Sequence, residues 1–122
     1  MTKKAKGYKE LNGAVVLYAD NYINDLEGEK IEDLCALFLE RGVRKIVIDF
    51  SSTDIINSIG VSILIGIIEK VKDRGGTLFF SGLKRVNHDI FSLVGISRHV
   101  DMYSTEEDAV KALGSVKGTL LM

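Results

Sequence analysis

The sequence has no proline, no tryptophan, one cysteine and two histidines. The single cysteine, Cys35, cannot form a disulfide within the chain. We interpret it as a small apolar residue on the inner face of a helix, and we expect a reducing compartment such as the cytoplasm. His88 and His99 lack carboxylate or cysteine neighbours at the spacing of a catalytic triad or a metal site. These absences argue against an enzyme and predict no metal and no cofactor.

The net charge is also small, and no apolar run is long. Sixteen basic and 17 acidic side chains leave a formal net charge of −1, which gives no electrostatic reason to expect nucleic acid or an anionic membrane as a partner. The apolar run "IGVSILIGII" at 59–68 ends at Glu69 and Lys70, short of the roughly 18 to 20 residues of a membrane-spanning helix. No signal-peptide pattern opens the chain. We therefore expect a soluble protein.

The length and composition are those of one globular domain. The chain has 122 residues, of which 46% are hydrophobic and 27% charged, and it shows no internal repeat and no linker-like segment. A domain of this size buries a core without help from metal or disulfides. We expect a single domain over 1–122, with a core of about 7–115 and frayed tails at 1–6 and 116–122.

Hydrophobic periodicity divides the chain into alternating strands and helices. Two strands around Asn12-Gly13 at 7–19 predict a tight hairpin. The predicted elements that follow are a helix over 24–42, a strand over 43–52, a helix over 58–74, a strand over 77–83, a helix over 86–95, a strand over 99–104 and a closing helix over 105–113. The order β-β-α-β-α-β-α-β-α predicts an α/β fold with about five strands in a mixed, mostly parallel sheet and four helices.

Two helix starts carry capping signals. Asn24 and Glu27 have the spacing of a capping box at the first helix, and Gly42 provides its stop. Ser104 and Glu107 have the same spacing before the closing helix. Both pairs predict where these helices begin.

The helix at 58–74 is apolar on more than one side. On a helical wheel one face is the expected core side, formed by Gly60, Val61, Leu64, Ile67, Ile68 and Val71. The opposite face carries Ile59, Ser62, Ile63, Gly66, Glu69, Lys70 and Asp73, with Ile65 at the border. Its first two turns place isoleucines beside small residues, which favours a docking surface for another protein. The alternative is that another element of the same domain covers it.

Ser58 stands at the start of this helix. A serine there can cap the free backbone N–H groups, a contribution of about 1 kcal/mol, but Asn57 can cap equally well. The same position suits a phosphate, because helix N-termini favour anions. A phosphoryl group of roughly −1.5 to −2 charge beside Ile59 and Ile63 would oppose docking of an apolar partner. Capping and a phosphorylation switch are both open from the sequence.

Enzymatic alternatives have little support. The stretch "NSIGVS" lacks the first glycine of a G-x-S-x-G elbow, and the glycines form no P-loop or dinucleotide fingerprint. Asp49 ends a central strand, as a phosphate-accepting aspartate of a receiver domain would. That chemistry also requires further carboxylates for Mg²⁺, and none stands beside Asp20.

The stretch "VIDFSSTDIINSIGVSILIGIIEKVKDRGGTLFFSGL" resembles the core of STAS domains, in particular the small stand-alone bacterial anti-sigma factor antagonists. That family has a strand ending in aspartate, an Asp-Ser-Ser-Gly turn, an apolar helix, a Gly-Gly stop and another strand. The segment "LVGISRHVDMYSTEEDAVKAL" resembles the family's final strand and closing helix, so the resemblance spans about Gly13 to Leu113.

The resemblance implies roles for individual residues. Ser58 matches the phosphoacceptor serine, and Asp49 and Gly60 match turn-shaping positions. We expect the partner-binding surface to comprise Asn57, Ser58, Ile59, Ser62, Ile63 and Gly66.

The implied function is partner switching. The unphosphorylated protein binds an anti-sigma factor, a histidine-kinase-like serine kinase that uses ATP, and so frees a sigma factor. The kinase phosphorylates the serine and releases the complex, and a serine phosphatase reverses the modification. The antagonist itself catalyses nothing and is a monomer or a weak homodimer.

Two positions depart from the family pattern. Asn57 stands where members usually carry aspartate, and Ile59 stands where a second serine often follows. A STAS scaffold or regulatory subunit that is not phosphorylated, in a stress-signalling or transporter assembly, is the alternative that these departures leave open.

Overall fold

A computed structural model describes residues 7–115, so the tails expected at 1–6 and 116–122 lie outside the described residues. The elements follow in the order β1 (Tyr8–Leu11), β2 (Ala14–Tyr18), β3 (Tyr22–Ile23), α2 (Asp25–Glu40), β4 (Lys45–Asp49), β5 (Ile55–Ile56), α3 (Ser58–Asp73), β6 (Thr77–Ser81), α4 (Arg85–Leu93), the 3-10 helix η1 (Ile96–Arg98), β7 (Asp101–Tyr103) and α5 (Glu106–Leu113).

A five-stranded sheet in the order β1-β2-β4-β6-β7 forms the centre of the molecule. β1 and β2 are antiparallel and joined through Gly13, whose φ of 79° is the positive value that a tight hairpin turn requires. The other neighbouring pairs are parallel. Over residues 7–115, the mixed, mostly parallel sheet and the four α-helices confirm the predicted α/β fold class.

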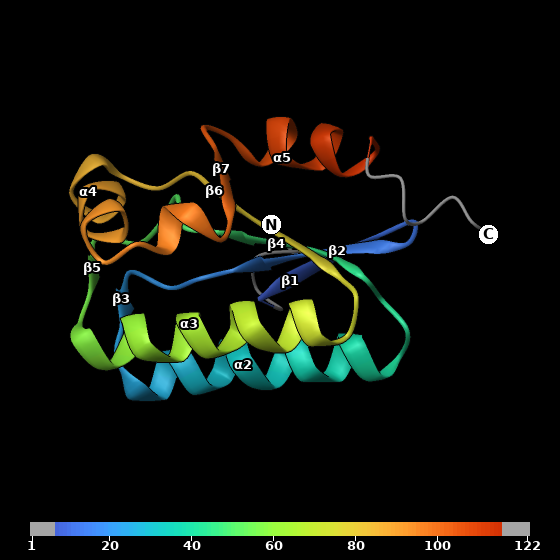
Figure 1. Cartoon of the computed structure of the whole chain (residues 1–122), viewed down its shortest axis with the longest axis horizontal. Coiled ribbons are helices and arrows are strands. Elements are labelled where there is room, and N and C mark those ends of the chain that lie inside the picture. Colours follow the sequence, from blue (N-terminus) through green and yellow to red (C-terminus); the bar gives the residue numbers. More distant parts are fainter. Residues whose placement is uncertain (1–6, 116–122) are drawn as a thin grey trace.

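The helices cover the sheet unequally. α2 and α3 lie side by side on one face, α5 lies on the other, and α4 lies at the end where the parallel strands finish (Figure 1). Successive strand residues point to opposite faces, so Val15 and Leu17 enter the core under α2 and α3 while Val16 enters the smaller core under α5. The rings of Phe50, Phe80 and Phe91 pack against one another and tie α4 to the larger core.

Only one of the two hydrogen bonds of the predicted capping box forms at the start of α2. Asn24 Oδ1 accepts a hydrogen bond from the Glu27 backbone N–H (3.0 Å). The Glu27 carboxylate does not return to Asn24; it accepts a hydrogen bond from the backbone N–H of Asp20 (2.9 Å). The helix ends as predicted, with Gly42 at a φ of 93°. The capping pair therefore also anchors the end of β2 to the start of α2.

Two predictions at the C-terminal end were wrong in detail. Thr105, not Ser104, caps α5, because its Oγ1 accepts a hydrogen bond from the Asp108 backbone N–H (3.1 Å). The last strand covers only Asp101–Tyr103, since the chain before it turns through η1. Either hydroxyl of the Ser-Thr pair had the right chemistry, so the sequence could not choose between them.

A second, two-stranded sheet was not predicted. β3 and β5 pair in parallel, with Tyr22 opposite Ile55 and Ile23 opposite Ile56. Both strands come directly before a helix, β3 before α2 and β5 before α3. This short sheet therefore sets where both helices begin.

Candidate functional site

The turn that carries Ser58 joins β5 to α3. Asn57 is the N-cap of α3, and its Oδ1 accepts a hydrogen bond from the Gly60 backbone N–H at 2.8 Å. Ser58 is the first helical residue and its side chain is exposed. Within residues 7–115, no hydrogen bond from or to the Ser58 hydroxyl is found. Of the two capping candidates, Asn57 therefore performs the role and leaves the Ser58 hydroxyl free.

The electrostatic environment at this helix start suits an added negative charge. The first turn of α3 contains no acidic residue, whereas that of α2 contains Asp25 and Glu27. Backbone N–H groups at a helix N-terminus carry partial positive charge and interact favourably with anions. No like charge on the first turn of α3 opposes such an anion.

Gly60 allows this turn to lie against β3. A Cβ at Gly60 would stand 2.5 Å from the Ile23 carbonyl oxygen and 3.0 Å from the Ile23 side chain. Real Cβ atoms do not approach that closely, so only glycine lets α3 start here. The Ile23 carbonyl also accepts a hydrogen bond from the Asn57 backbone N–H (3.0 Å), which fixes the turn from the same side.

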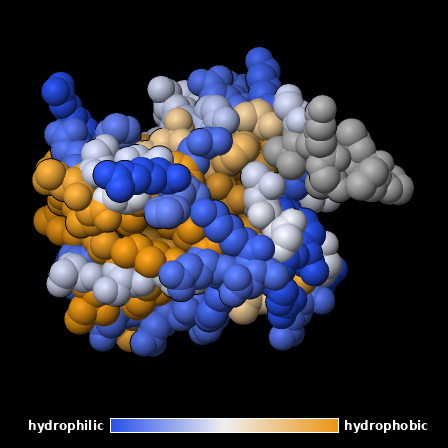
Figure 2. Space-filling model, viewed as in Figure 1, coloured by the Kyte–Doolittle hydropathy of each residue, from blue (hydrophilic) through white to orange (hydrophobic). Residues whose placement is uncertain are grey.

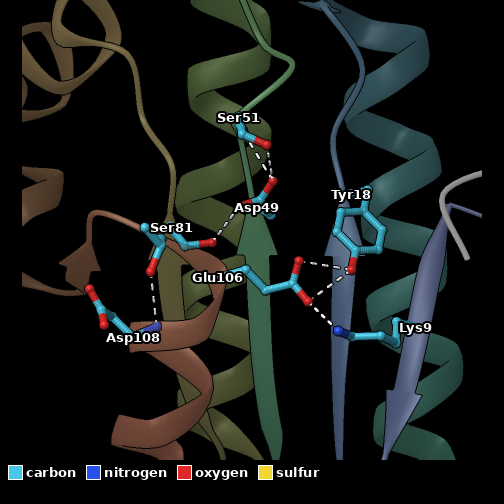
Figure 3. Close-up of polar contacts among 8 residues, drawn as sticks. Lys9, Tyr18, Asp49, Ser51, Ser81, Glu106 and Asp108 are labelled. Atoms are coloured by element: carbon cyan, nitrogen blue, oxygen red, sulfur yellow. Dashed lines mark hydrogen bonds and ion pairs between the residues drawn. The ribbon is translucent and has the colours of Figure 1, made fainter. Parts of the chain in front are cut away.

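Asp49 holds the loop that leads from the central strand toward this turn. It is 4% exposed at the end of β4. One of its carboxylate oxygens accepts a hydrogen bond from Ser81 Oγ (2.7 Å), and the other accepts from the backbone N–H (3.2 Å) and hydroxyl (2.5 Å) of Ser51 (Figure 3). The carboxylate thus joins the end of β6 to the loop after β4, and it is enclosed by its hydrogen-bond donors.

The outer face of α3 differs in part from its prediction. Ile59 is 52% exposed, Ser62 is exposed, and Gly66 has open space where a Cβ would stand. Ile63 is partly buried, because a Cβ at Gly28 of α2 would lie 2.8 Å from Ile63 Cδ1. The helix α2 covers part of Ile63, so this side chain is less accessible than the helical wheel indicated, and its place in the partner-binding surface stays a prediction. The first turns of α3 remain open around Ser58, Ile59 and Ser62.

Two apolar residues beside the turn were missed. Tyr22 is 45% exposed and Ile55 is 59% exposed, and they are paired across the β3–β5 sheet. The Tyr22 hydroxyl accepts a weak hydrogen bond from Asn57 Nδ2 (3.3 Å). Figure 2 shows hydrophobic residues gathered at the end of the molecule where α3 begins and α4 lies. In the sequence, Tyr22 and Ile55 are apolar residues beside residues that favour turns. This pattern does not reveal whether their side chains face solvent.

A polar cluster on the other face of the sheet is structural. The Tyr18 hydroxyl donates to the Glu106 carboxylate, whose oxygens are both 2.9 Å away, and Lys9 pairs with the same carboxylate (Figure 3). Burial, and next the hydrogen bond to Glu106, raise the pKa of Tyr18 well above its usual range. These contacts tie β1 and β2 to the start of α5, on the opposite side of the sheet from α3.

Other kinds of site are not seen in the described part of the chain. No group of three or more His, Cys, Asp or Glu side chains between residues 7 and 115 could hold a metal ion. None of the helices over the same residues is long and apolar enough to cross a membrane.

Comparisons with known proteins agree with this architecture. BtrV of Bordetella bronchiseptica, a proposed anti-sigma factor antagonist, is 21% identical over 103 residues, which cover 84% of this chain and 89% of BtrV. The crystal structure of TM1081 from Thermotoga maritima, also a proposed anti-sigma factor antagonist, has a TM-score of 0.79 at 22% identity, covering 88% of this chain and 92% of TM1081.

The anti-sigma factor antagonist SpoIIAA has the same fold. Its unphosphorylated structure has a TM-score of 0.72 at 17% identity, covering 89% of this chain and 97% of SpoIIAA. The phosphorylated form of SpoIIAA from Bacillus has a TM-score of 0.70 at 18% identity, covering 87% of this chain and 96% of that one. At these identities the structural likeness shows the fold, and the family is shown by the sequence. The family model described as the STAS domain matches residues 6–109, and the chain belongs to the STAS domain family.

Proposed function

We propose that this protein is an anti-sigma factor antagonist whose binding to an anti-sigma factor is controlled by phosphorylation of Ser58. The single observation that carries the proposal is the free, exposed Ser58 hydroxyl at the start of α3, where Asn57 already provides the cap. Phosphorylation there would not remove a hydrogen bond of the fold. The helix N-terminus would stabilise the added anion.

The surroundings of Ser58 explain how phosphate would control docking. Exposed Ile59, Ile55 and Tyr22 provide apolar surface that a partner can cover. A phosphoryl group would place roughly −1.5 to −2 charge in the middle of that contact. Burying this charge under an apolar partner is costly unless the partner supplies cations, so the complex would dissociate.

The relatives support this proposal. BtrV and TM1081 are both described as proposed anti-sigma factor antagonists, and SpoIIAA has been solved in unphosphorylated and phosphorylated forms. In the proposed scheme the partner is an anti-sigma factor that acts as a histidine-kinase-like serine kinase with ATP, and a serine phosphatase restores the free hydroxyl. In this scheme the antagonist supplies the acceptor and the docking surface, performs no catalysis, and acts in the cytoplasm as a monomer or weak homodimer.

A second candidate, a STAS scaffold that is not phosphorylated, is favoured by Asn57 and Ile59. Asn57 lacks the carboxylate that family members usually carry before the serine, and Ile59 replaces a frequent second hydroxyl. Docking through the same surface does not depend on these two residues being acidic or hydroxylated. The two candidates therefore differ in the modification of Ser58 and share the surface.

Intact-mass measurement separates the candidates. The protein is incubated with Mg-ATP and the anti-sigma factor kinase from the same organism, and we expect a gain of one phosphate. Ser58→Ala should abolish this gain, whereas Ser62→Ala, which removes an exposed hydroxyl one turn further along α3, should retain it. Binding without any gain in mass would replace the switch by the scaffold, and a gain that survives Ser58→Ala would overturn the assignment of the acceptor.

A further inference from the structure

The helix α4 contacts the loop between β4 and β5 through two polar side chains. Asn87 is 1% exposed, and its Nδ2 donates to the backbone carbonyl of Thr53 (3.3 Å) and more weakly to that of Asp54 (3.5 Å). Lys84, the residue before α4, forms an ion pair with the Asp54 carboxylate. The start of α4 is thus attached to the loop that precedes the Ser58 turn.

The same loop is held from its other side by the segment between β2 and β3. Thr53 is fully buried, and its hydroxyl donates to the Asp20 carbonyl (2.7 Å). The Asn21 carbonyl accepts hydrogen bonds from the backbone N–H groups of Asp54 (2.7 Å) and Ile55 (3.2 Å). Residues 53–55 therefore lie between two anchors, one of which is the buried amide of Asn87.

Packing of α4 alone does not explain why a polar residue, Asn87, occupies this buried position. A buried amide is costly unless it is hydrogen-bonded, and an apolar side chain at this position would pack without that requirement. Its side-chain hydrogen bonds among residues 7–115 both go to the loop carbonyls. Ile55, which is exposed and begins β5, comes directly after the two residues that carry these carbonyls. Ser58 follows β5 and the capping residue Asn57.

We propose that Asn87 is a positioning residue for the Ser58 turn: it fixes residues 53–55, so that Ile55 and Ser58 reach the partner in one arrangement. The inference rests on the proposed function for its consequence in binding, while its structural part can be tested without a partner. Losing the amide leaves two loop carbonyls without their donor. The loop then opens locally, and the docking surface is no longer preorganised.

Hydrogen exchange of the backbone amides measures this local opening. The measured quantity is the ratio of the exchange rates of Asp54 and Ile55 to the exchange rate of Val47, a fully buried residue of β4 in the same protein. In Asn87→Leu, which has no donor and a similar size, we expect the ratio to rise at least tenfold. Asn87→Ser, which keeps a hydroxyl in a smaller side chain, serves if the leucine variant does not fold, and a rise in the same ratio is again expected.

The matched control is Leu113→Ala, which removes buried apolar volume under α5 on the opposite face of the sheet. It lowers global stability without touching the loop. Global opening speeds exchange of Val47, which lies in the same small core as Leu113, so the ratio should fall or stay unchanged and should not rise by more than threefold. An unchanged ratio in the folded Asn87 variant, or the same rise in Leu113→Ala, would overturn the positioning role.

Binding of the unphosphorylated protein to the anti-sigma factor kinase provides the functional readout. We expect Asn87→Leu to bind at least tenfold more weakly than Leu113→Ala. Equal affinities of these two variants, with tight binding by the wild type, would refute the inference and leave the proposed function standing. Failure of the wild type to bind any anti-sigma factor would refute the proposed function, and the exchange ratio would then decide the role of Asn87 alone.

Discussion

At the scale of single residues, two glycines on α3 differ sharply in their surroundings. Gly60 lies against the Ile23 carbonyl, which a Cβ would approach to 2.5 Å, while Gly66 has nothing within 4 Å of the same position. Neither glycine has a positive φ. Any difference between them on substitution by alanine therefore comes from space alone.

We expect Gly60→Ala to lower the free energy of unfolding by about 2 kcal/mol, since the clash is with backbone and cannot be relieved by a side-chain rotation. Gly66→Ala should raise the free energy of unfolding by roughly 0.5 to 1 kcal/mol through helix propensity. Urea unfolding of both variants provides the measurement. A stabilising Gly60→Ala would mean that α3 does not start against β3 as described.

The identity of the residue that caps α3 could not be predicted from the sequence. Both Asn57 and Ser58 can cap a helix, and the choice depends on where the backbone leaves β5. The pairing of β5 with β3 makes that choice, because it places the Asn57 N–H on the Ile23 carbonyl. A contact between residues 34 apart in the chain is not visible in local pattern.

At the scale of elements, the core side of α3 was predicted well and its outer side only in part. Of the six residues that the wheel placed on this side, Val61 is partly buried against the core, and the other five are buried: Gly60, Leu64, Ile67, Ile68 and Val71. Ile63 was placed outside because a wheel shows angles but not neighbours. The close approach of α2, allowed by Gly28, decides which part of the outer face is covered.

Lysine substitutions at Ile59 and Ile63 test this division of the helix. Ile63→Lys should lower the free energy of unfolding by about 2 to 3 kcal/mol, because it brings a charge to the α2 contact. Ile59→Lys should change stability by less than about 0.5 kcal/mol and should abolish partner binding, because Ile59 is exposed beside Ser58. The readouts are urea unfolding and binding to the anti-sigma factor kinase. The division would be wrong if Ile59→Lys proved the more destabilising of the two.

At the scale of the whole molecule, the layers follow from hydrophobic pattern. The nearly continuous apolar run of β4 predicts a central strand covered on at least one face, and the structure places a core on each side of β2 and β4. The two-residue strands β3 and β5 could not be predicted, because strands this short have no period to read. Their pairing joins Tyr22 to Ile55, which are far apart in the chain, and local pattern does not show such a contact.

The free energy of unfolding at alkaline pH depends on the protonation of Cys35, whose thiol lies in the larger core. The thiol is 2% exposed on α2, and burial raises its pKa from about 9 to about 12, with smaller effects of Lys70 and Glu32. The native state therefore keeps this proton at a pH where the unfolded chain has lost it. The contribution is complete below pH 9 and is lost as pH rises toward 12.

We accordingly expect the free energy of unfolding to fall between pH 8 and pH 10.5 by about 2 kcal/mol more in the wild type than in Cys35→Ala. The comparison removes the effect of Tyr18, whose pKa is also raised, because both proteins retain it. Urea unfolding at the two pH values gives the difference, and slow reaction of the native thiol with a disulfide reagent at pH 8 provides an independent check of burial. Equal pH dependence in the two proteins would show that the thiolate is tolerated in the native core, and that α2 does not seal the core at this position.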